Sequence, residues 1–200
     1  MTTTFVLAAP RIVVGLLMAG HGLQKLAGWF GGPGLQGTAD FLGSLHVRAG
    51  SRWAMALAVA ETIGGALMAL GFLQPLGQLV VATVLLVAIA LVHWQKGLWN
   101  TNGGLEHPLV LATVALASAT APIGWSLDGT LGIAVPAWIS LIAAIAMAIV
   151  ALGVVVGRST AAGVPVPAET APASNGETEG SRPMPPVRWA IWRRDLRIWR

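Results

Sequence analysis

Ionisable side chains inside apolar sequence are the first candidates for chemistry in this chain, because a charge within a membrane helix is costly and normally has a partner. Glu61 is the key example, since it is the only carboxylate in the apolar stretch 53–73. Its natural partners are Lys25, Arg11 or a protonated histidine. A buried carboxylate beside a histidine can exchange protons near neutral pH when the pair is connected to water. Glu61 and His93 are therefore predicted to exchange protons.

Further polar residues fall toward the same predicted face of the molecule. His21 and Lys25 are four residues apart, so they share one face of a helix. Arg11 lies in the same broad sector of that helix but nearer the opposite membrane face, where its long side chain can snorkel outward or pair internally. Glu106 and His107 come directly before another apolar stretch. We predict that the catalytic residues are Glu61, His93, Lys25 and His21, and that the cofactor-binding residues are Arg11, Glu106 and His107.

Each of these candidates also has a structural interpretation. An ion pair of Glu61 can simply hold two helices in register. His21 and His93 can be neutral imidazoles bonded to a backbone carbonyl or to Glu61. Glu106 and His107 can cap a helix, where a carboxylate is favourable without any further function.

Metal, haem and phosphate sites have weaker support from the sequence. The Glu-x-x-His pairs of di-iron bundles are absent, and the spacing of the histidines is not a haem motif. We therefore predict no metal site. The glycines of WFGGPGLQG do not follow a strand, so they predict an irregular loop rather than a phosphate-binding turn.

The composition shows what kind of structure must position these residues. Of the 200 residues, 55% are hydrophobic and 10% are charged, whereas a soluble domain carries about 25% charged residues. The chain has no cysteine, which excludes disulfides, thiol nucleophiles and Cys-ligated metals made from this chain. Redox chemistry would therefore need a bound cofactor or a partner protein. Half of the basic residues lie in the last nineteen, so the net charge of +4 belongs mainly to a tail and does not indicate nucleic-acid binding.

Five apolar runs predict an all-α, polytopic membrane bundle, because a helix satisfies its own backbone hydrogen bonds in lipid. The runs cover about Phe5–Ala27, Trp53–Leu73, Gly77–Trp94, Pro108–Pro122 and Thr130–Gly157. Gln74 and Pro75 leave room only for a tight turn, so the second and third runs are predicted to form an antiparallel hairpin. We expect a four-helix core over residues 1–128 and an additional transmembrane helix over residues 129–157.

The C-terminal part changes composition twice. Residues 158–187 are rich in Pro, Ala, Ser, Gly and Glu, which predicts a disordered linker. Residues 188–200 place tryptophans and a leucine on one helical stripe among arginines, as in a basic amphipathic helix that lies on anionic lipid. The alternative is that this short segment stays unfolded in water.

Basic residues in the loops predict the orientation in the membrane. Arg48, Arg52 and Lys96 would share one side with the C-terminal tail, whereas the other loops between the spans have no basic residue. Basic loops normally face the cytoplasm, so we expect the tail to be cytoplasmic.

Several strings in this order resemble the DoxX family of small bacterial membrane proteins. They are RIVVGLLMAGHGLQKLAGWFGG from Arg11, GTADF from Gly37, AETIGGALMALGF around Glu61, VHWQKGLWN around His93, GGLEHPL before the fourth run, and SLD ending at Asp128. The resemblance covers about Phe5–Asp128. It implies a four-helix bundle in the bacterial inner membrane, from which the fifth helix and the tail depart.

The resemblance also implies a redox setting. Relatives in the wider group include a subunit of thiosulfate:quinone oxidoreductase, and some DoxX proteins are proposed to assemble with superoxide dismutase and a thiol-handling partner. The first hypothesis is therefore a quinone-linked redox subunit, in which Glu61 and His93 exchange protons and Lys25 stabilises a developing anion. Its electrons would come from a partner protein or a bound flavin. The second hypothesis is a non-enzymatic scaffold or small-solute carrier, whose path a homo-oligomer could form.

Overall fold

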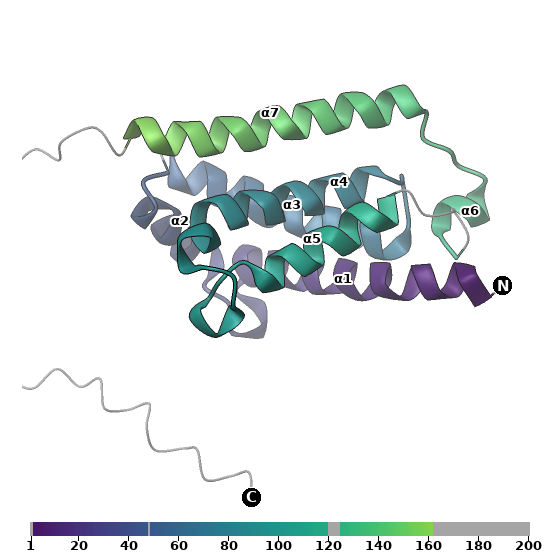
Figure 1. Cartoon of the computed structure of the whole chain (residues 1–200), viewed down its shortest axis with the longest axis horizontal. Helices are drawn as coiled ribbons and strands as arrows, with labels where there is room; N and C mark the ends of the chain where they lie inside the picture. The colour runs from purple at the N-terminus through teal and green to yellow at the C-terminus, as the bar shows by residue number, and fades with distance from the viewer. Residues whose placement is uncertain (1, 48, 120–124, 162–200) are drawn as a thin grey trace, which may run out of the picture. The chain divides into compact units, whose positions relative to one another are not determined.

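The computed structural model describes residues 2–47, 49–119 and 125–161, and this part of the chain is helical apart from short connections (Figure 1). Within these ranges no residue belongs to a strand, which confirms the predicted all-α class. The predicted tail helix 188–200 and nearly all of the predicted linker 158–187 lie outside the described residues.

Four helices form the centre of the bundle: α1 (Thr2–Ala27), α3 (Gly50–Leu70), α4 (Leu76–Ala88) and α5 (Glu106–Ala119). Helix α1 packs along α3, α3 packs against α4, α4 packs against α5, and α5 also contacts α1. The short connection between α3 and α4 produces the predicted hairpin. Helix α7 (Ala137–Ala161) lies along the outside of α4 (Figure 1).

A short helix begins inside the segment 29–37 that was predicted to be an irregular loop. After the 3-10 turn η1 (Trp29–Gly31), α2 (Gly34–Ser44) packs against α3 and α1. Thr38 and Leu42, four residues apart, form its buried face, and the Thr38 hydroxyl donates to the Gly34 carbonyl at 2.7 Å. The prediction of an irregular loop is confirmed for residues 29–33, where Phe30 and Gly31 have positive φ. It is wrong for residues 34–37, because tertiary packing stabilises this glycine-rich stretch as a helix.

The remaining elements connect the long helices. Helix α4 continues through a π-helical turn, η2 (Ile89–His93), and a 3-10 turn, η3 (Trp94–Lys96). The 3-10 turn η4 (Asn100–Asn102) precedes α5, and the short helix α6 (Leu127–Leu131) precedes α7. The predicted fifth run started too early, because α6 ends at the left-handed Gly132 and α7 begins only after Pro136.

Three helices in the described ranges are long and apolar enough to cross a membrane, namely Gly50–Leu70, Leu76–Lys96 and Ala137–Val156. By their length and composition they indicate a multi-pass membrane protein. Helix α5 is apolar but has only 14 residues, which spans about 21 Å of a hydrocarbon core roughly 30 Å thick. Arg11, His21 and Lys25 make α1 more polar than the three spans. That α1 and α5 also cross the bilayer stays a prediction.

Small residues allow α1 and α3 to approach with their backbones nearly in contact. A Cβ atom on Gly22 would lie 2.3 Å from the Thr62 hydroxyl oxygen, and one on Gly65 would lie 2.4 Å from the Ala19 nitrogen. In lipid, helix association depends on such close packing because water does not drive apolar faces together. The glycines therefore fix how α1 and α3 face each other.

Candidate functional site

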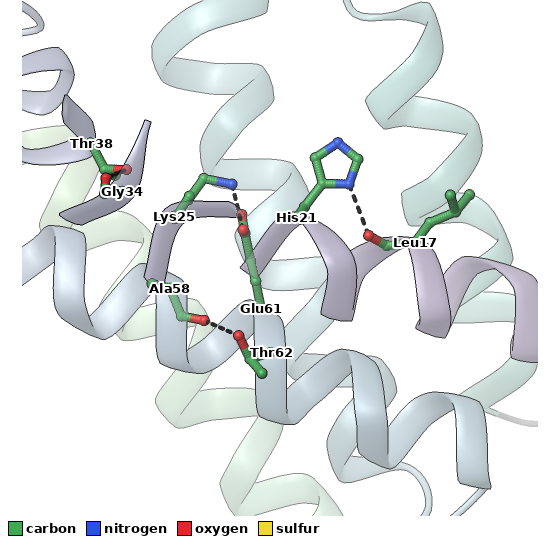
Figure 2. Close-up of polar contacts among 8 residues, drawn as sticks. All are labelled: Leu17, His21, Lys25, Gly34, Thr38, Ala58, Glu61 and Thr62. Carbon is green, nitrogen blue, oxygen red and sulfur yellow. Dashed lines mark hydrogen bonds and ion pairs between the residues drawn. The ribbon is translucent and has the colours of Figure 1, made fainter. Parts of the chain in front are cut away.

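An ion pair between Lys25 and Glu61 lies at the α1–α3 contact. The Lys25 ammonium donates a hydrogen bond to Oε2 of Glu61, and Figure 2 shows the two side chains pointing toward one another from the two helices. The Glu61 side chain is 6% exposed and that of Lys25 is 23% exposed. The carboxylate is thus buried, and its cation is the part that solvent or a ligand can reach.

Local structure explains why this pair can form. Gly22 precedes Lys25 by three residues and Thr62 follows Glu61, and the close contact of Gly22 with Thr62 brings the two helices together at this level. The Thr62 hydroxyl is turned to the Ala58 carbonyl of its own helix, at 2.7 Å, so it does not compete for the ammonium. Lys25 also lies in the last turn of α1, where free carbonyl groups favour a cation.

His21 stands one turn from Lys25 on the same helix. Its Nδ1 lies 2.8 Å from the Leu17 carbonyl (Figure 2), and the ring is exposed. A carbonyl only accepts, so Nδ1 carries the hydrogen, and Nε2 of the neutral ring is left as a proton acceptor. His21 also interacts electrostatically with Glu61. The site therefore combines a buried carboxylate, a partly accessible ammonium and an exposed imidazole.

His93 and Glu106 lie in a different arrangement, in which they hold a loop. His93 Nδ1 donates to the Gly103 carbonyl at 2.7 Å, and the Glu106 carboxylate accepts from the Asn100 backbone N–H at 3.0 Å. Backbone hydrogen bonds close the same loop, including Glu106 N–H to the Leu98 carbonyl at 2.9 Å. No ion pair or hydrogen bond joins either side chain to Glu61 in the described ranges, and the adjacent His107 is exposed.

Arg11 belongs to a second polar cluster, fourteen residues before Lys25 in α1, or roughly 21 Å along the helix axis. The residue is 3% exposed, and its guanidinium donates through Nη2 to the Trp125 carbonyl at 2.7 Å. It also interacts electrostatically with Asp128. The sequence placed Arg11 in the same helical sector as Lys25 but nearer the opposite membrane face, where its side chain could snorkel outward or pair internally, and the structure shows an internal hydrogen bond.

Asp128 is the residue of this second cluster that the sequence did not indicate as functional. Its two carboxylate oxygens accept from the backbone N–H groups of Leu73 and Gln74, at 2.9 and 2.8 Å, and its own N–H donates to the Gly71 carbonyl at 3.1 Å. Asp128 therefore closes the α3–α4 turn from 54–55 residues away in sequence. We call Arg11, Asp128 and the turn residues they bind the Arg11–Asp128 cluster.

Two cavities accompany these polar groups. An apolar cavity of about 380 Å³ lies between α3, α4 and α7, and Glu61 is not among its lining residues. A second hollow of about 490 Å³ lies beside Arg11 and Trp125. Within the described ranges, no group of three or more His, Asp or Glu side chains is arranged to hold a metal ion.

The comparisons with known proteins agree with the sequence strings noted above. Residues 6–94 match the family model described as DoxX, which covers α1 to the end of the π-helical turn and includes Lys25, Glu61 and His93. The match does not extend over Glu106, His107 or Asp128. No curated protein and no solved structure shows a significant match to the chain. Residues 6–94 of the chain therefore form a DoxX domain, and this domain contains the Lys25–Glu61 pair.

Proposed function

We propose that this protein is the quinone-binding membrane subunit of a redox system, that the Lys25–Glu61 pair binds the quinone, and that His21 delivers protons to it. The observation that carries the proposal is the location of the pair. A carboxylate that is 6% exposed is joined to an ammonium that is 23% exposed, at the end of α1. Ionisable groups held this way inside membrane helices commonly mark proton or substrate pathways.

The chemistry follows from the types of the three residues. Reduction of a quinone to a quinol takes up protons as well as electrons. Lys25 can donate a hydrogen bond to a quinone oxygen and stabilise the negative charge that develops there. His21 can deliver a proton from the exposed side, and Glu61 holds Lys25 in place and balances its charge. The electrons must come from a partner protein or a bound flavin, because the chain has no cysteine and no recognisable cofactor motif.

The geometry changes the predicted roles of the other candidates. His93 and Glu106 hold the loop before α5, so we assign them to support rather than to proton exchange. Arg11 is assigned to the second polar cluster and not to the quinone. The protein is proposed to act in the bacterial inner membrane, with the Arg52 and Lys96 end on the cytoplasmic side as the positive-inside rule predicts.

A scaffold or small-solute carrier is the second candidate function. The close glycine contacts between α1 and α3 favour it, because an ion pair beside such a contact can act only to fix the register of the helices. The two functions differ in what the pair is needed for. A redox subunit needs the pair for quinone binding, whereas a scaffold needs it for folding or assembly.

The test compares Glu61→Gln with Asp40→Asn, which neutralises an exposed carboxylate on α2. Each protein is purified gently from bacterial membranes, and its quinone content and thermal stability are measured. We expect quinone with the wild-type chain and with Asp40→Asn, and its loss from Glu61→Gln while the folded state persists. Quinone that is absent from the wild type, or that remains bound to Glu61→Gln, would reject the redox proposal. If the Glu61→Gln protein is obtained only in an unfolded form, the result would favour the scaffold function.

A further inference from the structure

The apolar cavity between α3, α4 and α7 is a second feature, separate from the ion pair. Small side chains on α3, including Ala56 and Ala60, leave the space, and Met147 of α7 also lines it. The volume of about 380 Å³ falls within the range of roughly 300–1,000 Å³ that ligand pockets occupy. Most of its lining residues come from the three apolar spans, with Leu42 of α2 and Val47 in addition, so the cavity lies at the depth of the lipid chains.

The lining excludes water as the natural occupant. Every lining residue is apolar except Thr83, and the Thr83 hydroxyl already donates to the Leu79 carbonyl at 2.7 Å. A buried water needs two to four polar partners, and this cavity offers none that is free. A hydrocarbon chain is the ligand that such a surface can hold.

A positive charge lies one helical turn beyond the lining of the cavity. Ala56, Ala60 and Ile63 form a lining stripe on α3, and Arg52 continues this stripe by one turn toward the start of the helix. Trp53, which also lines the cavity, is the next residue. Arg52 is exposed, and the first turn of α3 contains no acidic residue. An arginine at the end of a hydrocarbon-lined space is complementary to a chain that ends in an anionic phosphate.

We propose that this cavity is a binding site for an anionic phospholipid, with one acyl chain between α3, α4 and α7 and the phosphate paired with Arg52. The site lies on a different face of α3 from Glu61, which the cavity does not include. It therefore does not depend on the proposed quinone function. Helix α7 packs mainly on α4, and in this proposal it lies between the bound acyl chain and the surrounding bilayer.

The experiment uses the full chain in nanodiscs of phosphatidylcholine that contain phosphatidylglycerol with a photoreactive group on its acyl chain. After illumination, labelled residues are located by peptide mass analysis. We expect the label on cavity residues such as Met147 and Thr83 in preference to outward-facing residues of α7 such as Leu141 and Leu152. Equal labelling of both sets would show only bulk lipid contact and would overturn the proposal.

The second part of the experiment fills the cavity with larger side chains. Ala60→Leu adds bulk to the lining, and Ala148→Leu makes the same change on an exposed position of α7 outside it. Ala56→Leu is a further filling variant whose native side chain is exposed, so it is tolerated if Ala60→Leu unfolds the protein. In the filling variants, labelling of the lining residues should fall to the level seen for the outward-facing residues of α7. In Ala148→Leu it should stay unchanged. Unchanged labelling in a folded filling variant would contradict the site.

The charge is tested with Arg52→Gln against Lys96→Gln, which removes another exposed cation outside the cavity. The preference for phosphatidylglycerol over phosphatidylcholine should fall about fivefold in Arg52→Gln, the factor expected for one basic residue near an anionic surface, and should persist in Lys96→Gln. An equal effect of both variants would reject the role of Arg52.

If a prenylated quinone displaced the photoreactive lipid from the lining of the wild-type chain, the occupant would be a quinone tail and the phospholipid assignment would be wrong.

Discussion

The Lys25–Glu61 pair and the Arg11–Asp128 cluster both hold opposite charges within this helical bundle, but they are built differently. In the cluster, the Asp128 carboxylate accepts from two backbone N–H groups and Arg11 donates to a backbone carbonyl. In the pair, two side chains meet through one hydrogen bond, and Lys25 stays partly exposed. Charged side chains that form hydrogen bonds with backbone groups stabilise the fold. Charged side chains that bond only to each other remain available to a ligand.

The largest effect should come from breaking the cluster with Asp128→Ala. This change leaves two backbone N–H groups without their acceptor and removes the negative charge near the buried Arg11. We expect a loss of about 3–5 kcal/mol in the free energy of unfolding, measured by denaturation in detergent. Asp40→Ala removes an exposed carboxylate and should change stability little. Equal stability of the two variants would contradict the structural role of the cluster.

A smaller effect is expected from Gly22→Ala, which tests how the pair is positioned. Its Cβ would meet the Thr62 backbone nitrogen at 2.4 Å, so α1 and α3 must move apart. Overpacking of this kind costs about 1–3 kcal/mol, and it should also lower quinone content. The matched control is Gly20→Ala, because a Cβ there meets nothing within 4 Å. If both variants behaved like the wild type in thermal unfolding, close contact would not position the pair.

His93→Ala should have a local effect. The loss of its hydrogen bond to the Gly103 carbonyl should cost about 1 kcal/mol and should loosen residues 97–105, with quinone content unchanged. Hydrogen exchange of the backbone amides in that loop measures the change. Loss of quinone from a folded His93→Ala protein would contradict this supporting role and would show that His93 is needed for quinone binding.

The smallest change in stability is expected for His21→Gln, because the ring is exposed and bonds only to its own helix. Thermal unfolding should match that of the wild type. Proton uptake during quinone reduction should slow, since the proposed donor on the exposed side is lost. A reduction rate equal to that of the wild type would remove His21 from the proposed mechanism.

Much of the fold could be predicted from the sequence because apolar length and the cost of backbone groups in lipid leave few alternatives to helices. The tight turn at Gln74 and Pro75 correctly indicated the α3–α4 hairpin. Helix α2 was missed because its glycines carry no helical signal and its stability comes from burial of Thr38 and Leu42 against the bundle.

The candidate site was only partly predictable. Glu61 was expected to pair with Lys25, Arg11 or a histidine, and the structure shows Lys25 as the partner. Helical periodicity gives the direction of a side chain but not its partners on other helices. Arg11 was therefore counted among the possible partners of Glu61, although it was expected nearer the opposite membrane face and lies about 21 Å from Lys25 along the helix. The role of Asp128 depends on contacts 54–55 residues distant in sequence, which no local pattern reveals.

The proposed role of the pair in quinone binding is tested most directly by exchanging its charges. Lys25→Glu and Glu61→Lys are made singly and together, and thermal stability and quinone content are measured for each protein. The single variants place like charges at the α1–α3 contact and should be destabilised, and the double variant should recover much of that stability. We predict that the double variant still lacks quinone, because its ammonium now lies at the buried position. Recovery of quinone together with stability would contradict this account and would leave the pair as a helix-locking contact.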